Sequence, residues 1–600
     1  MFSWIMMAVL VLSCAGSGYA QEEAFELEPI VVSAAKFPTP GKKNPRQVDI
    51  LDSQEIEPFA VNNINDVLKI SPIDIQSRGG ADTQADISIR GSSFEQVLVL
   101  VNGLRVSDPQ TGHYDLDIPV PLNEIERVEI LHGPASTLYG ADAFGGVINI
   151  ITKKPKKFGV FAKGSYGQYN TSSLEGKLSY NFKNTAISHS IQKEKSNGQR
   201  YDTDYDVLTF FSNADFELPF MDLNALFGYQ DKEYGAFDFY SPGRNFPSRE
   251  WINTKLVQVK GETKNETIKF EPKLFFRRHD DKFSLDQNRP NFNLNYHTTY
   301  IYGGELASKI KLHENNSLAA ATEYSVEKIK STNIGKHSFE KYAVLLEDTL
   351  DIGKLSATIG ARLDHHSKFG YFLSPSLNTA ILVSEMFKIR GGISRCFRAP
   401  SFTELYYNDA ANKGNPDLMP EKALSYEAGF DIYPKNNLQL GGTVFLRDEK
   451  NSIDWVKYSK TDIKWQVTNI GKMKTYGIEA YLKQDLWKDA KISLFYTYLG
   501  HLFDKDQGYI SKYKLRAPTH QVNLNFIQQL PFQITATFSA TYKKRPSERD
   551  YTILDAKISK NIDNFEIFFE VNNIGNSKYY DILGVPGLRR LFKAGCSVKF

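Results

Sequence analysis

Residues 125–154 read IERVEILHGPASTLYGADAFGGVINIITKK, in which two strand-like segments flank a glycine-containing connection. Charged and apolar residues alternate from Glu126 to Ile130, which is the period of a β-strand with one buried face. Two glycines, Gly145 and Gly146, then lead into an apolar run that ends at Ile151. The quoted segment therefore predicts two strands in the core of a compact domain.

The sequence before this segment adds further elements of the same domain. Val97 to Val101 is a continuous apolar run followed by Asn102-Gly103, which predicts a buried strand and a tight turn. A short helix is predicted from Asn65 to Lys69, and Pro72 ends it. We therefore predict a mixed α/β domain over residues 45–155.

From about Phe158 to Phe600 the sequence follows a different period. Segments of alternating apolar and polar residues succeed one another, and polar turns with Gly or Asn separate them. Clear examples are residues 174–182, 534–542 and 592–600. One face of each predicted strand is apolar while the other carries charged, hydroxyl or small side chains, which is typical of strands with lipid on one side.

A membrane β-barrel explains this region better than a soluble sandwich does. The 40 Phe and 32 Tyr residues suit aromatic girdles at a membrane interface, and no apolar run after residue 20 is long enough for a membrane helix. An unpaired strand edge is too costly in hydrocarbon, so the sheet must close. At about twenty residues per strand and connection, we predict about 22 antiparallel strands in residues 156–600. A barrel that wide would leak unless filled, so we expect the α/β domain inside its lumen.

The first 20 residues predict a secretory signal peptide. An apolar core from Ile5 to Cys14 precedes the small-x-small site Gly18-Tyr19-Ala20, which places the mature N-terminus at Gln21. Lipidation at Cys14 is the alternative, but its cleavage box is imperfect. The remaining cysteines, Cys396 and Cys596, indicate no disulfide framework. The near balance of 72 Lys and Arg against 70 Asp and Glu argues against a nucleic-acid partner.

Several motifs stand in a fixed order along the chain. In the α/β domain they are Ile89-Arg90-Gly91, VLVNGLRV at residues 99–106 and the quoted residues 125–154; in the barrel they are FRAPS at 397–401, GNPDL at 414–418, Pro420-Glu421, YGIE at 476–479, NNI at 572–574, Tyr579 and the final Phe600. This series resembles the TonB-dependent outer-membrane receptors. The loop from Gln110 to His113 and the Phe239-Tyr240 segment resemble their cobalamin-receptor-like branch. The resemblance implies a receptor of the cell outer membrane, expected to be a monomer, whose N-terminal plug gates the import of a small molecule.

The same resemblance assigns a coupling segment ahead of the plug. Residues 21–44 would hold a TonB box and a linker, and the box is identified as Glu28, Pro29, Ile30, Val31, Val32, Ser33 and Ala34. Pro29 favours an extended chain, and the β-branched run after it suits strand addition to the sheet edge of a partner. We expect the linker from Ala35 to Pro45, rich in Pro and Lys, to be mobile enough to carry the box into the periplasm.

Four charged residues of the plug are expected where it meets the polar barrel wall. A polar interface can be broken and remade more readily than an apolar core. The candidates are Arg90, Arg127, Glu129 and Asp142.

The candidate ligand site combines aromatic with polar side chains. Such mixtures suit a large amphiphilic metal chelate or a corrinoid, with cobalamin favoured and a ferric siderophore as the competitor. For any single residue, packing in a loop or an interface girdle is the alternative. The candidates are Gln110, His113, Tyr114, Phe239, Tyr240, Tyr406 and Tyr407.

Three acidic residues suggest an optional calcium site. Asp202, Asp204 and Asp206 follow Arg200-Tyr201 in a predicted external loop, and calcium prefers oxygen ligands. The Gly and terminal Glu of an EF-hand are missing. No cofactor is otherwise required.

Other classes of protein fit the sequence less well. A passive porin or a surface adhesin would have no use for a plug or a box. An enzyme is not expected, because neither a Gly-x-Ser-x-Gly elbow in a suitable context nor a His-Glu-x-x-His motif is present. The expected partners are TonB with its inner-membrane energising complex, outer-membrane lipid, the small-molecule ligand, and the barrel-assembly machinery through the strand that ends in Phe600.

Overall fold

The computed structural model describes residues 30–31, 33–80, 83–155, 158–434, 437–487, 489–503, 508–514, 516–546, 548–582 and 584–600. Within them, 22 antiparallel strands close into a barrel, which confirms the predicted architecture and strand number. The predicted signal peptide and residues Glu28, Pro29 and Val32 of the box lie outside the described residues.

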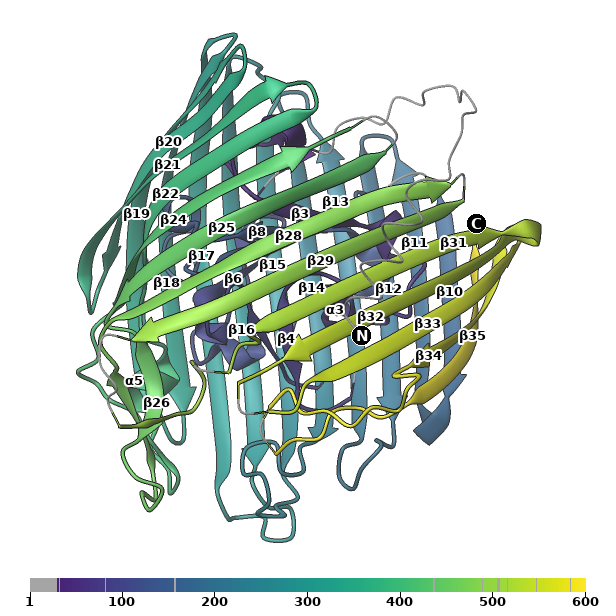
Figure 1. Ribbon diagram of the computed structural model, residues 1–600, viewed down its shortest axis with the longest axis vertical. Helices are drawn as coiled ribbons and strands as arrows, with labels where there is room; N and C mark the ends of the chain where they lie inside the picture. Colours follow the sequence, from purple (N-terminus) through teal and green to yellow (C-terminus); the bar gives the residue numbers. More distant parts are fainter. Residues whose placement is uncertain are drawn as a thin grey trace.

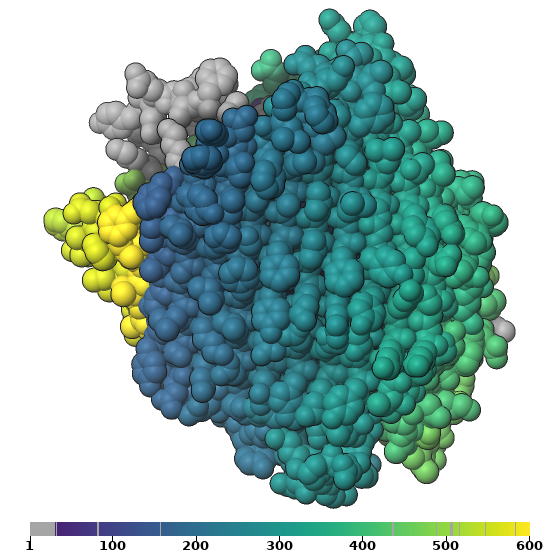
Figure 2. All heavy atoms as spheres, turned by 180° about the vertical axis from the view of Figure 1, so that it is seen from behind, coloured from purple at the N-terminus to yellow at the C-terminus, as the bar shows by residue number. Residues whose placement is uncertain are grey.

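Each barrel strand pairs with its neighbours in chain order, and the first strand pairs with the last. Figure 2 shows the yellow C-terminal strands directly beside the blue beginning of the barrel. The strands are β10 (Gly159–Gly167), β11 (Ser172–Phe182), β12 (Thr185–Ser196), β13 (Tyr205–Glu217), β14 (Met221–Gly235), β15 (Arg249–Thr263), β16 (Ile268–Ser284), β17 (Leu294–His313), β18 (Asn316–Ser331), β19 (Gly335–Ile352), β20 (Leu355–His366), β21 (Gly370–Ser384), β22 (Phe387–Arg398), β24 (Glu421–Ile432), β25 (Leu438–Lys450), β28 (Met473–Trp487), β29 (Ala490–Phe503), β31 (His520–Leu530), β32 (Ile534–Lys544), β33 (Tyr551–Ile562), β34 (Phe565–Asn572) and β35 (Leu591–Lys599).

The alternation in sequence corresponds to the two faces of the wall. In β11, Leu174 and Phe182 are 66% and 69% exposed, whereas Glu175 is buried against the interior. A strand places successive side chains on opposite faces, so the apolar set meets lipid and the polar set meets the lumen. The lumen is therefore lined with charged, hydroxyl and amide groups.

The two ends of the barrel differ in their connections. Tight turns join strands at one end, the turn end, and longer loops join them at the other, the loop end. In barrels of this type the turns face the periplasm and the loops face the outside. The loops contain the helix α5 (Phe402–Tyr406) and a four-stranded sheet of β23 (Asn412–Lys413), β27 (Trp465–Asn469), β26 (Ile453–Lys457) and β30 (Ile510–Ser511).

The N-terminal domain lies within the barrel, where its elements are drawn in purple in Figure 1. Its five-stranded sheet has the order β3-β8-β9-β6-β7, and β6 runs parallel to β9. The elements are β1 (Ile30–Val31), β2 (Thr39–Pro40), β3 (Val48–Asp52), α2 (Ser53–Ile56), α3 (Ile64–Lys69), β4 (Asp74–Ser77), β5 (Ala85–Ser88), β6 (Val97–Val101), β7 (Leu104–Arg105), β8 (Ile125–His132), α4 (Ser136–Tyr139) and β9 (Gly146–Thr152), with short 3-10 helices at 41–43, 94–96, 112–114 and 122–124.

An aliphatic core holds this domain together. Val99, Ile130 and Ile148 are fully buried at the centre of the sheet, and Leu68 of α3 packs against the same cluster. Asn63 begins α3 by accepting a hydrogen bond from the backbone N–H of Asp66 (3.1 Å). The predicted strands at Val97–Val101 and within residues 125–151 are confirmed as β6, β8 and β9.

Two further expectations concern helices and cysteines. None of the helices in the described ranges has the length and apolarity needed to cross a membrane. Cys396 is buried and Cys596 exposed, and both are free thiols.

Candidate functional site

The described part of the proposed box is held against the plug. Ile30–Val31 pairs with Thr39–Pro40 as a short antiparallel ribbon, and Val31 is buried among apolar residues of the plug sheet. The backbone N–H of Ser33 donates to the Glu129 carboxylate (2.9 Å), and its hydroxyl donates to the same oxygen. Tyr139 donates to the carbonyl of Ser33 (3.3 Å). The segment is therefore a separate ribbon that packs on the plug through side-chain contacts.

The segment after the box is anchored to the barrel, which corrects the expectation of a mobile linker. The backbone N–H of Lys36 donates to Glu347 (2.8 Å), and its ammonium pairs with Glu305. Phe37 is buried among small and aliphatic side chains of β17, β18 and β19. Lys43 pairs with Asp351 at the turn end (2.5 Å). The reason is chemical: an aromatic ring and a lysine both find complementary partners on the wall.

Arg90 makes charged contacts between the plug and the barrel wall. Its guanidinium donates to Glu427 (2.7 Å) and to Glu479 (2.7 and 3.0 Å), and its carbon lies 4.5 Å from the ring centroid of Phe445. Both Arg90 and Gly91 have positive φ, 51° and 68°, so this turn suits a glycine at its second position. Of the four charged residues expected at the interface, this one ion-pairs across it.

His132 extends the same network within the plug. Its Nδ1 lies 2.9 Å from Glu479, and its Nε2 lies 2.8 Å from Asp49. Burial lowers the pKa of His132, but the two carboxylates outweigh it and raise the pKa to about 9. The ring is therefore a cation at neutral pH and links plug to wall through Glu479.

The ion pairs of the other three expected interface residues lie inside the plug. Arg127 pairs with Glu126 and Glu129, at 3.1 and 2.9 Å. Asp142 pairs with Arg105 (2.7 Å). Their places follow from the sheet: Arg127 and Glu129 are on one face of β8, where the N-terminal segment covers Glu129.

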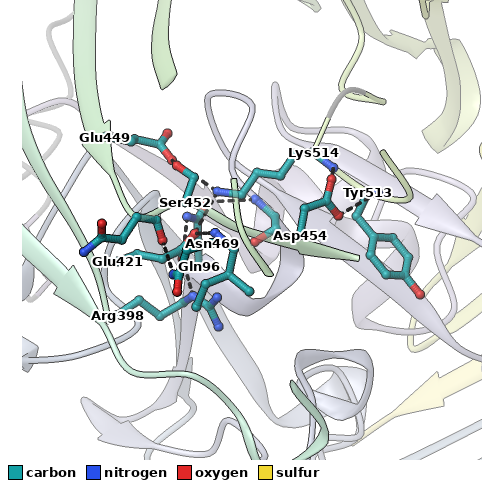
Figure 3. Close-up of polar contacts among 12 residues, drawn as sticks. Gln96, Arg398, Glu421, Glu449, Ser452, Asp454, Asn469, Tyr513 and Lys514 are labelled. Carbon is teal, nitrogen blue, oxygen red and sulfur yellow. Dashed lines mark hydrogen bonds and ion pairs between the residues drawn. The ribbon is translucent and has the colours of Figure 1, made fainter. Parts of the chain in front are cut away.

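A second buried network joins the plug to the loop end of the barrel (Figure 3). Gln96 of the plug donates to Glu421 (2.9 Å), which also pairs with Arg398. Lys514, from the β29–β31 loop, lies 3.1 Å from both Glu421 and Glu449. Arg398 and Glu421 stand in the FRAPS and Pro-Glu motifs, but the sequence carried no signal for Glu449 of β25 or for Lys514, since their contact joins a strand to a loop 65 residues away.

The helix α5 rests directly on the plug. The backbone N–H groups of Phe402 and Thr403 donate to the carbonyls of Pro109 and Gln110, at 3.0 and 3.1 Å. Beneath them the Glu95 carboxylate accepts hydrogen bonds from Thr111 and Gly112, both at 3.0 Å. Burial, aided by Glu404, raises the pKa of Glu95 to about 8. The outer loops and the plug apex thus share backbone hydrogen bonds.

The predicted ligand residues of the plug are largely covered. Gln110 is buried and its side-chain oxygen has no partner within the described chain. His113 stacks on Phe94 (4.0 Å between centroids) and its Nδ1 lies 2.6 Å from Asp86. Burial lowers the pKa of His113 despite this carboxylate. Tyr114 donates to Asp281 of the wall (3.0 Å).

The predicted ligand residues of the barrel fall into two groups. Tyr240 donates to Gln84 of the plug (2.6 Å) and lies under Arg78, which pairs with Asp86 (2.9 Å). Phe239 packs against Gly79, where an added Cβ would lie 2.6 Å from its ring. Hence Phe239 and Tyr240 contact the plug apex. The members of the second group, Tyr406 and Tyr407, belong to the aromatic cluster around α5, where Tyr406 stacks on His337 (3.7 Å).

The three aspartates proposed for calcium do not form one site, which corrects that expectation: Asp202 lies 3.7 Å from Arg249, the partner of Asp204, but Asp206 lies apart from both. Asp204 pairs with Arg249 (2.8 Å), and Asp202 accepts from Gln287 (3.0 Å). Asp206 projects from β13 toward Lys193 on the outer face. Throughout the described chain, no three His, Cys, Asp or Glu side chains are placed to hold a metal ion. The spacing of the aspartates was misleading for two reasons. Alternation along β13 turns Asp206 to the outer face, and neighbouring cations pair with Asp204 and Asp206.

Comparison with protein families matches both parts of this structure. Residues 155–574 match the family model described as "TonB dependent receptor-like, beta-barrel". Residues 40–147 match the one described as "TonB-dependent Receptor Plug Domain". The two matches follow the division seen in the structure, where the plug sheet ends at Thr152 and the barrel begins at Gly159.

Curated relatives and solved structures agree with this match. The chain is 26% identical over 585 residues to the iron-regulated outer membrane virulence protein of Vibrio cholerae serotype O1, covering 90% of this chain and 88% of the relative. It is 25% identical over 476 residues to the vitamin B12 transporter BtuB of Vibrio vulnificus, covering 75% and 74%, which supports the cobalamin-receptor-like branch.

Among solved structures, the ferric enterobactin receptor PfeA superposes with a TM-score of 0.77 at 18% identity, covering 92% of this chain and 99% of that one. The siderophore receptor PirA from Pseudomonas aeruginosa gives a TM-score of 0.70 at 20% identity, with coverage of 92% and 99%. These likenesses establish the fold. Together with the family matches, they show that this chain belongs to the TonB-dependent receptors and is an outer-membrane β-barrel with an N-terminal plug.

Proposed function

We propose that this receptor imports a scarce metal chelate or corrinoid, cobalamin being favoured, and that TonB drives the import by pairing with residues 28–34. The observation that carries the proposal is the attachment of the N-terminal segment. Its described residues form a separate two-stranded ribbon that is attached to the plug through buried Val31 and the hydrogen bonds of Ser33 to Glu129, so a pull on this segment acts on β8 of the plug. The interface that must then give way is polar and ionic.

The cargo assignment draws on the relatives. The vitamin B12 transporter favours a corrinoid. The iron-regulated relative matches a larger share of the chain, which keeps a ferric siderophore as the second candidate. The mixture of aromatic and polar side chains at the plug apex suits either cargo. We expect no enzymatic activity, and we expect the final strand to engage the barrel-assembly machinery.

The proposed coupling is tested by uptake of labelled cobalamin and of ferric siderophores in cells with and without TonB. We expect Ile30→Pro to abolish uptake, because proline removes a backbone donor needed for strand addition. Lys42→Ala, an exposed change in the same segment, is the matched control. Surface binding of the cargo should be unchanged in both variants.

Uptake that persists without TonB would contradict energised import and favour a passive porin. Binding without any uptake in the wild-type receptor would instead favour a surface adhesin.

A further inference from the structure

A cavity of 160 Å³ lies between the plug and the barrel wall. On the plug side it is lined by α3 and by Gly79 and Gly80; on the barrel side it is lined by β10 to β13 and by β32 and β33. At the loop end it reaches the β12–β13 loop and the β34–β35 loop. It therefore extends from the outer loops down to a helix of the plug.

The wall of this cavity combines apolar side chains with hydroxyl and charged groups. Serine and threonine hydroxyls of four barrel strands and a loop belong to this lining, and they offer donors and acceptors of no net charge. Six of them are Ser165, Ser173, Ser196, Thr203, Ser539 and Thr541. These hydroxyl groups can hydrogen-bond the polar part of a solute that enters the cavity.

Two of the four cationic side chains in the lining have no ion-pair partner among the described residues. Among the cations, Lys69 pairs with Asp66 (3.0 Å) and Lys593 pairs with Glu570 (2.6 Å). Arg200 and Arg589 form no ion pair with any described residue. Both sit in the loops that close the outer end of the cavity, so its mouth carries two guanidinium groups without an ion-pair partner in the described chain.

These two arginines are held in place by their surroundings. Gln199 accepts a hydrogen bond from the backbone N–H of Arg589 (2.6 Å) and donates to its carbonyl (3.1 Å), which ties the two loops together. Arg200 donates to the carbonyl of Arg78 in the plug (3.4 Å). Nη1 of Arg589 is shielded from solvent and finds no acceptor in the described chain. A buried donor without a protein acceptor is a place where a water molecule or a ligand atom can accept a hydrogen bond.

We propose that this cavity binds a small anionic molecule through Arg200 and Arg589, with a carboxylate or phosphate group as the recognised chemistry. Planar guanidinium groups match the geometry of both anions. The bound anion would lie beside Gly79 and Gly80, where an added Cβ on Gly80 would be 2.7 Å from the Tyr205 ring. One part of this inference, that the imported cargo carries an anionic group, rests on the proposed import role. The anion site itself does not.

The test is calorimetric titration of the purified full-length receptor in detergent, with inorganic phosphate and succinate as separate titrants. We expect Arg589→Gln and Arg200→Gln each to weaken binding by about tenfold or more, since each removes a charge-assisted hydrogen bond. Arg590→Gln is the matched control, because this exposed neighbour donates only to a loop carbonyl (3.3 Å). Arg589→Lys keeps the charge without the planar fork and should give an intermediate loss.

Absence of binding by the wild-type receptor would overturn the proposal, and so would an equal loss in Arg590→Gln. Binding of one titrant only would support it and select between carboxylate and phosphate. Thermal unfolding of each variant shows whether the barrel is intact. If arginine-dependent binding is found without TonB-dependent uptake, the anion site stands and the import role fails. If uptake is energised but anion binding is unaltered in the arginine variants, the import role stands and the anion site fails.

Discussion

The interior of the plug and its surface against the barrel are both buried, but they are built from opposite chemistry. The interior is an aliphatic cluster around Val99, Ile130 and Ile148. The surface is joined to the wall by ion pairs such as those of Arg90 and Asp74, the latter with Lys543 and Arg545. Aliphatic packing resists separation by volume and shape, whereas buried charges attract specific partners and can be rehydrated. This difference indicates that the plug can remain folded while its polar contacts with the wall, here called its seat, are broken.

The largest effect is expected from Arg90→Ala. Removing the cation leaves Glu427 and Glu479 buried without their main partner, a situation that costs about 3–5 kcal/mol. We expect the plug to lose its seating while its own sheet stays protected. Hydrogen exchange of plug amides, together with sensitivity of the cells to a large antibiotic, measures both properties.

Glu126→Gln, at an exposed plug residue, is the control for Arg90→Ala. If the Arg90 variant stays as impermeable as the wild type, the polar seat is not what retains the plug.

Ile148→Ala probes the other side of the comparison. Truncating this fully buried side chain should cost about 2–5 kcal/mol of plug stability through lost burial and a cavity. Exchange should then rise in β6, β8 and β9 themselves, unlike in Arg90→Ala. Ile151→Val, on the same strand but half-buried, should change exchange little. The same exchange pattern in the Ile148 and Arg90 variants would show that core and seat are one cooperative unit.

The third effect depends on pH and acts through His132. Its pKa is raised from 6.5 to about 9 in the seated plug, so its contribution is complete below pH 6.5 and is lost as pH rises toward 9. The contribution is on the order of 3 kcal/mol by the size of the shift. We expect the protection factors of plug amides, which are corrected for the intrinsic pH dependence of amide exchange, to fall between these values, and His132→Gln to remove that fall. A wild-type profile that is flat over this range would contradict the role of the imidazolium.

The smallest effect is expected at the N-terminal segment. Lys36→Ala removes an ion pair with Glu305 but leaves the backbone hydrogen bond to Glu347, and release of the segment should ease by about 1–2 kcal/mol. Limited proteolysis near residue 36 measures it. Lys43→Ala removes an ion pair whose lysine side chain is 47% exposed. It should therefore change the rate of proteolysis little. Equal proteolysis of the Lys36 variant and the wild type would place the anchor elsewhere.

The sequence predicted the architecture well because barrel and plug follow local rules. Alternation along β11 and β32 depends only on neighbouring residues, and the apolar run of β6 is equally local. The site was less predictable, since Arg90 finds Glu427 and Glu479 across 337 and 389 residues. The misassigned calcium site has the same cause: the partners of Asp204 and Asp206 come from other strands.

The seam between β10 and β35 has a consequence for how the molecule is made. The first and last strands of the wall are partners, with Phe161 opposite Lys599, so the ring stays open until the ribosome has finished the chain. The plug is synthesised before any strand of the barrel, and it connects to β10 at the turn end. It must therefore be enclosed as the seam shuts or be threaded in afterwards from the periplasmic mouth. In either case, the plug reaches its final position only after the last strand of the barrel has been made.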